Sequence, residues 1–138
     1  MQAVAKEVRS SQKGCAMDQI VDRTDLLQRC MNDQAFVTQM LEVFREYAPK
    51  TLKLLHDAVT AGDWTAARRH AHTLKGSAAN ISAGALKTRA QETEKAIDSG
   101  FTEDAAHLLA AVDAAMNECL KAVDRILADP GSLKQDAC

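Results

Sequence analysis

Four amphipathic stretches joined by short turns constrain the fold of this chain more than any other feature. Apolar residues recur at intervals of three and four in the segments 32–63, 64–81 and 84–98, and again from 102 to just before Pro130. No segment of useful length shows the alternation of a strand, and connections such as AGDW and DSGFTED leave no room for long crossovers. The sequence therefore predicts an all-α fold: an up-and-down antiparallel four-helix bundle, with an additional short N-terminal helix within 18–31.

Single residues predict where these helices bend, begin and end. Pro49 removes a hydrogen bond inside the first long segment and predicts either one bent helix or two abutting helices. Gly62 is typical of a helix end, and Asp63 is typical of the cap of the next helix. We expect Thr102 or Asp104 to cap the last helix.

Helical spacing in the first long segment predicts the following inward-facing residues: Phe36, Met40, Phe44, Tyr47, Thr51, Leu55 and Val59. In the last helix the inward residues are expected to be Ala105, Leu108, Val112, Met116, Cys119, Val123 and Ile126.

Length and charge set the organisation of the chain and the classes of partner. The 138 residues suit one domain, which we place at 18–128, with a flexible leader at 1–17 and a flexible tail at 129–138. A net charge of -2 makes nucleic acid a poor partner, and no apolar run approaches the roughly 18 residues of a membrane span. The N-terminus lacks the apolar core of a signal peptide, so we expect a cytoplasmic protein without membrane insertion, and a monomer.

The stretch RRHAHTLKGSAANISA, residues 68–83, carries a glycine inside a predicted helix, where it costs about 1 kcal/mol relative to alanine. The core-facing stripe of this helix is predicted to be Trp64, Ala67, Ala71, Leu74, Ala78 and Ile81. His72 lies about 130° from the centre of that stripe on the helical wheel. Its neighbours on the helix surface are Arg68, Arg69, Lys75, Gly76 and Ala79. The exposed face thus presents one imidazole, three cations and a patch with almost no side chain.

This face has the chemistry of phosphoryl transfer. A neutral imidazole is a competent nucleophile at neutral pH, and phosphoryl transfer needs positioning and positive charge rather than covalent machinery. Lys75 can supply that charge, and Gly76 leaves room for a partner to approach His72. No acidic cluster able to hold a metal accompanies His72, so we expect no metal in this chain and a metal that comes with the partner.

The other histidines give weaker hypotheses. His70 and His72 are two residues apart and point to opposite sides of a helix, which is not the spacing of a zinc pair. His70 is expected at the edge of the core, whereas His56 and His107 have no evident partners and are expected at the surface. No phosphate loop, nucleophile elbow or kinase signature is present.

The run AHTLKGSAANI resembles the signature of histidine-containing phosphotransfer (HPt) domains, and the resemblance covers roughly residues 18–128. It implies that His72 is the phospho-acceptor through Nε2 and that Lys75 steadies the phosphoryl group. It also implies that Gly76 and Ser77 open the surface on which a partner docks. The implied partners are receiver domains, which bring the aspartate and the Mg²⁺, among them the receiver of a hybrid sensor histidine kinase.

Two departures from the family pattern concern the surroundings of the histidine. Many members have a glycine where Ser82 stands, and here Gly84 comes two places later. Some members carry a polar residue, often glutamine, near the phosphate on the next helix, where this chain has Glu94. Because a carboxylate would repel a phosphoryl group, the sequence assigns Glu94 no binding role.

Two functions remain open at this point. The first is a phosphorelay intermediate that takes a phosphoryl group from one receiver aspartate and passes it to another, without independent catalytic turnover. The second is a helical adaptor, or pseudo-HPt, that binds receiver or kinase domains without being phosphorylated. His72 and Lys75 favour the first. Arg68 and Arg69 are either a solvated face or a pair that steers an acidic receiver surface.

Overall fold

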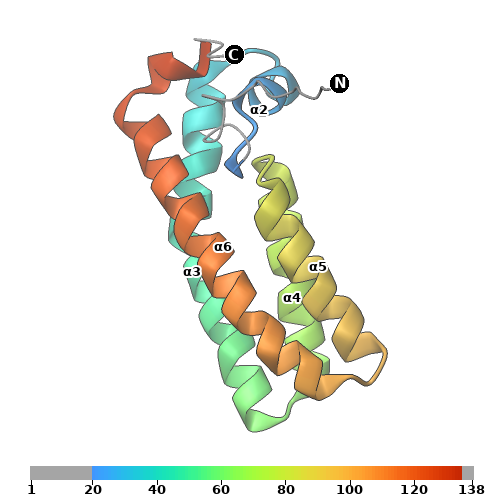
Figure 1. Ribbon diagram of the computed structural model, residues 1–138. Helices are drawn as coiled ribbons and strands as arrows, with labels where there is room; N and C mark the ends of the chain where they lie inside the picture. The colour runs from blue at the N-terminus through green and yellow to red at the C-terminus, as the bar shows by residue number, and fades with distance from the viewer. Residues whose placement is uncertain (1–19, 135–138) are drawn as a thin grey trace, which may run out of the picture.

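The computed structural model describes residues 20–134, in which every regular element is helical (Figure 1). The elements are α2 (Arg23–Arg29), α3 (Gln34–Ala61), α4 (Trp64–Asn80), α5 (Gly84–Asp98), α6 (Thr102–Ala128) and the 3-10 helix η3 (Pro130–Lys134). The predicted all-α class is confirmed. Within the described residues no helix combines the length and the apolar character that crossing a bilayer requires.

The four long helices lie side by side. In Figure 1 the chain runs down α3, up α4, down α5 and up α6. Contacts join each of these helices to the next one along the chain, and α3 also packs against α6. The core therefore lies between four helices, and α4 and α5 share the most extensive of these contacts.

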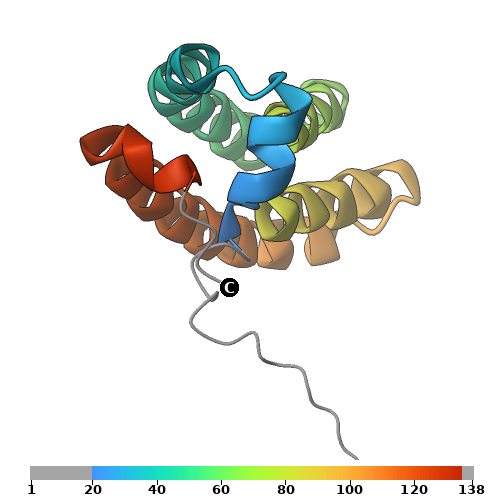
Figure 2. The ribbon, with the colours of Figure 1, turned by 90° about the horizontal axis from the view of Figure 1, so that it is seen from above.

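The short helix α2 lies across one end of the long helices, as the view from above shows (Figure 2). It is fastened there to Ser82, in the turn between α4 and α5. The Asp22 N–H donates to the Ser82 carbonyl at 3.0 Å, and the Ser82 hydroxyl donates to Asp25 Oδ2 at 2.6 Å. Ser82 has a φ of 58°, in the left-handed region that few side chains adopt, so these bonds hold an unusual backbone conformation.

The helix boundaries confirm some of the predicted signals and correct others. Gly62, with a φ of 73°, ends α3, and Asp63 caps α4 by accepting from the Ala66 N–H at 3.1 Å. Pro49 lies inside one continuous helix, so the alternative of two abutting helices is wrong. The predicted side-chain cap of α6 is also wrong, because the backbone of Phe101 occupies the cap position without a side-chain bond.

Burial confirms the predicted inward face of α4 and corrects that of α3. The buried residues of α3 are Val37, Leu41, Phe44, Ala48, Leu55 and Ala58. Phe36 and Tyr47, which were expected in the core, are exposed. The error has a physical cause: α3 carries apolar residues on two neighbouring stripes, and only one of them faces α4 and α6. A smaller correction of the same kind applies to α6, in which Leu109 is buried in place of Leu108.

The packed part of the chain continues beyond the predicted boundary at 128. Residues 130–134 form η3, which contacts α2, α3 and α6, and its Leu133 is buried in the core. The expectation of a loose tail from 129 onward is therefore wrong for this segment, because one apolar side chain anchors it. The predicted leader at 1–17 and residues 135–138 lie outside the described part.

Candidate functional site

His72 stands near the middle of α4 and points away from the core. Its neighbours Ala71 and Leu74 are fully buried, as the core stripe of this helix requires. The helical rotation between them turns His72 outward, and its side chain is 64% exposed. The predicted exposure of His72 is thus present in the structure.

Glu94 of α5 reaches across to this histidine and binds two groups of α4 at once. Its Oε2 lies 3.0 Å from His72 Nδ1, and its Oε1 lies 2.9 Å from Lys75 Nζ. The Glu94 side chain is only 10% exposed, and that of Lys75 is 26% exposed. His72, Glu94 and Lys75 therefore form one connected cluster between two helices.

The cluster keeps the Glu94 carboxyl ionised. Burial on its own would raise the pKa of Glu94, but hydrogen bonds and charge from Lys75 and His72 outweigh this and lower the pKa below its ordinary value. An ionised carboxylate can only accept hydrogen bonds, so the proton between it and the ring belongs to Nδ1. In the neutral imidazole the lone pair then resides on Nε2.

The predicted docking residues other than Ser77 lie on the same side of α4 as His72, whereas Ser77 lies on the side that faces α3. Beyond its chain neighbours and the backbone of its own helix, a Cβ atom added to Gly76 would meet nothing within 4 Å, so the helix is bare one turn after His72. Ser77 and Ala79 are half-buried beside it. Arg68 is exposed but engaged in an ion pair with Asp98 of α5, whereas Arg69 is exposed on the same turn.

Glu94 is the residue that sequence reasoning missed. Its charge predicts repulsion of a phosphoryl group, and that repulsion alone gives no indication of its contacts with the facing helix. The available signal was its position four residues after Ala90 and next to Thr93, both of which are fully buried. A carboxylate at the edge of a core stripe needs partners, and the facing helix offers Lys75 and His72.

The other histidines divide as follows. His56 on α3 is not without a partner, because its Nε2 lies 2.7 Å from Asp113 Oδ1 on α6. The expectation that it had none is wrong, since the two residues meet only when α3 packs on α6. His70 is half-buried and His107 is exposed. In the described part of the chain, no group of three or more His, Cys, Asp or Glu side chains could hold a metal ion.

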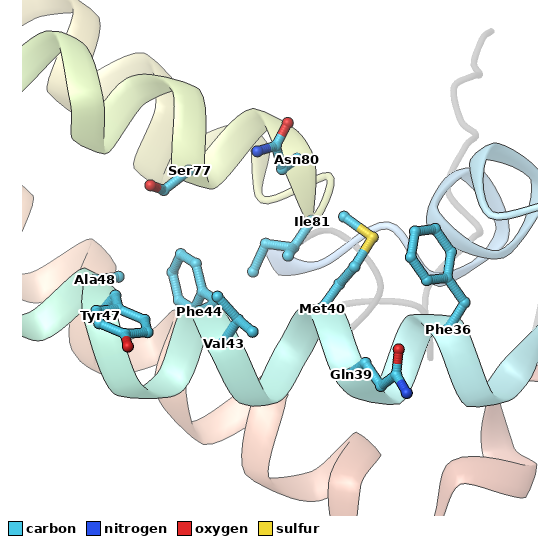
Figure 3. Close-up of a pocket in the computed structure, with 10 residues that line it drawn as sticks. All are labelled: Phe36, Gln39, Met40, Val43, Phe44, Tyr47, Ala48, Ser77, Asn80 and Ile81. Carbon is cyan, nitrogen blue, oxygen red and sulfur yellow. The ribbon is translucent and has the colours of Figure 1, made fainter.

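An apolar groove of about 370 Å³ lies between α3 and the C-terminal half of α4 (Figure 3). Its α3 side is lined by Phe36, Gln39, Met40, Val43, Phe44, Tyr47 and Ala48. Its α4 side includes Ser77 and Asn80, with Ile81 just beyond the helix. The groove therefore begins at Ser77, directly after Gly76. The second apolar stripe of α3 lines its other side.

Comparison with known proteins shows which fold and which family this chain has. A solved structure of a candidate histidine-containing phosphotransfer protein from rice matches with a TM-score of 0.73 over 88% of this chain and 89% of that chain, at 15% sequence identity. At that identity the match shows the fold alone. No curated protein matches this chain significantly. The model of the Hpt domain family matches residues 39–127, which is more than half of the chain and includes His72, Lys75 and Glu94. The chain therefore belongs to the Hpt domain family.

Proposed function

We propose that this Hpt domain is a phosphorelay intermediate. His72 accepts a phosphoryl group through Nε2 from the aspartate of one receiver domain and passes it to the aspartate of another. The observation that carries the proposal is the state of the ring: Glu94 binds Nδ1, and among the described residues no group bonds Nε2, which belongs to an exposed side chain. A nucleophilic nitrogen is thus directed outward on a rigid helix.

The electrostatics of the site support this reaction. The carboxylate of Glu94 would repel an incoming phosphoryl group, but the Lys75 ammonium lies 2.9 Å from it and offsets that charge. Lys75 thereby keeps the role of steadying the phosphoryl group, with Glu94 as its anchor in the unphosphorylated protein. The Mg²⁺ that completes the charge balance comes with the receiver.

The surface around His72 supports a protein partner. Gly76 leaves the helix bare beside the ring, and Ser77 leads from there into the apolar groove. Val43 and Tyr47 extend that groove as exposed apolar side chains on α3. We infer that a receiver covers Gly76, Ser77 and Ala79 together with this part of α3, while Arg69 lies at the edge as an exposed charge for steering.

The experiment is transfer from a panel of purified receivers phosphorylated in advance with a radioactive small-molecule donor and Mg²⁺. At least one receiver should label the domain at a site that is labile in acid and stable in base, as phosphohistidine is. His72→Gln should abolish the label, whereas His56→Gln, which removes the other carboxylate-bound histidine, should retain it.

Two results would contradict the proposal. Label that persists in His72→Gln would place the acceptor elsewhere. Receivers that bind the wild-type domain without labelling it would favour the adaptor function instead.

A further inference from the structure

We propose that two copies of this domain associate weakly through the outer side of α3, with the two helices antiparallel. The association hides part of the surface that a receiver covers, so it limits the amount of domain that is free for transfer. This effect on transfer rests on the proposed function, whereas the association itself does not.

An apolar stripe runs along the outer side of α3. Six large apolar side chains are exposed in the described part of the chain, and four of them, each 47–57% exposed, belong to this helix. Together with two further residues they recur at alternating intervals of four and three, which is the spacing of the contact seam in a coiled coil. We name this set the outer seam, and its members are Phe36, Met40, Val43, Tyr47, Lys50 and Leu54. Figure 3 shows the first four following one another along α3.

The outer seam is longer than the groove beside α4. That groove includes Val43 and Tyr47 but reaches only to Ala48. Leu54 lies six residues further along, or about 9 Å on the helix axis, and is 50% exposed. A partner that covers Val43 and Leu54 together must extend along the helix, as a second helix with the same spacing does. A second copy of α3 provides such a helix.

The charges beside the outer seam complement one another in an antiparallel pair. Glu46 and Lys53 lie on the same flank of the seam, seven residues apart, and their side chains are 60% and 76% exposed. When Val43 packs opposite the partner's Leu54, Glu46 comes beside the partner's Lys53. The twofold symmetry of such a dimer repeats this ion pair, so α3 is complementary to itself.

Lys50 distinguishes between the two possible orientations. A parallel pair would place Lys50 opposite the partner's Lys50, and the like charges would repel. An antiparallel pair places Lys50 opposite the partner's Tyr47 instead. The Lys50 Nζ already lies 5.3 Å from the centroid of the Tyr47 ring in its own helix, and an ammonium group is attracted to an aromatic face. The charged member of the seam is therefore accommodated only in the antiparallel dimer.

The association is expected to be weak. It uses one face of one helix in each copy, which falls below the roughly 1,200 Å² that lasting complexes bury. In addition, Glu46 and Lys53 have exposed partners within their own helix, Lys50 at 3.9 Å and Asp57 at 3.0 Å, although such pairs contribute little. We expect a dissociation constant of about 1 µM to 1 mM, which replaces the predicted monomer by an equilibrium between monomer and dimer.

The test is sedimentation equilibrium of the full chain across this concentration range, without a receiver and with a reductant that prevents disulfides between chains. The average mass of the wild type should rise from one chain toward two. Glu46→Lys should weaken association at least about tenfold, because both symmetric ion pairs become repulsive. Adding Lys53→Glu to that variant should restore association, since the charges are then exchanged. Glu42→Lys makes the same change of charge at an exposed position outside the seam and should associate as the wild type does.

A second measurement separates the second copy from a receiver as the occupant of this surface. Leu54→Arg changes the seam outside the groove, so it should abolish association without disturbing the groove. The transfer rate per domain from a fixed amount of receiver should fall as the wild-type concentration passes the dissociation constant. In Leu54→Arg that rate should stay constant.

Each outcome decides one of the two proposals. A wild type that remains monomeric at about 1 mM, or a double charge variant that associates as weakly as Glu46→Lys, would overturn the antiparallel dimer. Loss of receiver binding in Leu54→Arg beside a monomeric wild type would assign the outer seam to the receiver instead, and would also overturn it. A wild type that exchanges phosphoryl groups with no receiver would overturn the proposed function, while sedimentation would still report on the dimer.

Discussion

Among the described residues, two histidine–carboxylate pairs join neighbouring helices, and they differ in the ring nitrogen that the carboxylate binds. Between α4 and α5, Glu94 binds Nδ1 of His72, which leaves Nε2 directed outward. Between α3 and α6, Asp113 binds Nε2 of His56. The same two functional groups thus occupy opposite orientations at two interfaces of one fold.

The surroundings of the two pairs differ as well. Glu94 is 10% exposed and also binds Lys75, whereas Asp113 is 43% exposed and Lys53, near His56, binds Asp57 instead. One turn after His72 the helix has Gly76, and one turn after His56 it has Thr60. The comparison teaches that a histidine–carboxylate pair is not by itself a phosphotransfer site. The unbound Nε2, the lysine that also binds the carboxylate and the absence of a side chain at Gly76 distinguish the first pair from the second, and these are the features that the proposed transfer requires.

The largest expected difference concerns the lysines. Lys75→Ala should slow transfer from a phosphorylated receiver by about 100-fold, because it removes the positive charge nearest to the developing phosphoryl charge. Lys53→Ala should leave the rate unchanged, since Lys53 lies beside the other pair. Rapid-quench kinetics with a single receiver would measure both variants, and equal rates for them would remove Lys75 from the mechanism.

The carboxylates should differ in their contribution to stability. Glu94→Ala leaves the partly buried Lys75 and one side of His72 without their acceptor, and should lower the free energy of unfolding by about 1–3 kcal/mol. Asp113→Ala removes a solvent-exposed contact and should lower it by less than about 1 kcal/mol. Urea denaturation followed by circular dichroism would compare them. A larger loss for Asp113→Ala would reverse the ranking.

Gly76, which leaves the helix without a side chain beside His72, gives opposite predictions for stability and for receiver binding. Gly76→Ala should raise the free energy of unfolding by up to about 1 kcal/mol, because helix propensity improves and the new Cβ meets nothing within 4 Å. Gly76→Gln should improve propensity similarly but weaken receiver binding and transfer, so alanine is its control for bulk. Thr60→Gln is the matched change beside His56 and should not affect binding. Titration calorimetry would compare the affinities of Gly76→Gln and Gly76→Ala for a receiver. Equal affinities would contradict the docking role of Gly76.

The smallest effect is a pH dependence of stability. Because folding lowers the pKa of Glu94, its ionised form contributes stability above the unfolded value, about pH 4.3. That contribution disappears as the pH falls through the lower folded value. The difference in unfolding free energy between wild type and Glu94→Gln should therefore be constant near neutral pH and shrink below about pH 4.3. A difference that grows on acidification would contradict the sign of the shift.

Most of the fold could be predicted from the sequence because local signals agree with tertiary packing. Gly62 and Asp63 define the turn between α3 and α4, and the bounds of α5 fall at the predicted 84–98. The prediction failed where local periodicity is ambiguous. Phe36 and Tyr47 follow helical spacing as well as Val37 and Leu41 do, and only the position of the neighbouring helices decides which stripe is buried.

The candidate site could be predicted only in its α4 half. His72, Lys75 and Gly76 lie on one helix, so their spacing converts directly into a shared face. Glu94 and the pair of His56 with Asp113 depend on the alignment of different helices, which no single helical wheel contains. The predicted exposure of Lys75 fails for the same reason, because the carboxylate that draws its side chain to 26% exposure belongs to α5.

The contact between α2 and Ser82 bears on the register of the two helices that share the site. An α-helix rises about 1.5 Å per residue, so a slip of α5 along α4 by one residue would displace the Glu94 carboxylate by about half the length of its contacts with His72 and Lys75. The three-residue connection at 81–83 sets that alignment, and Asp22 and Asp25 hold Ser82 within it. The short helix α2 thus helps to fix the alignment of His72 with Glu94. A substitution that breaks its bonds to Ser82 would alter the contacts of His72 without changing any residue of the site.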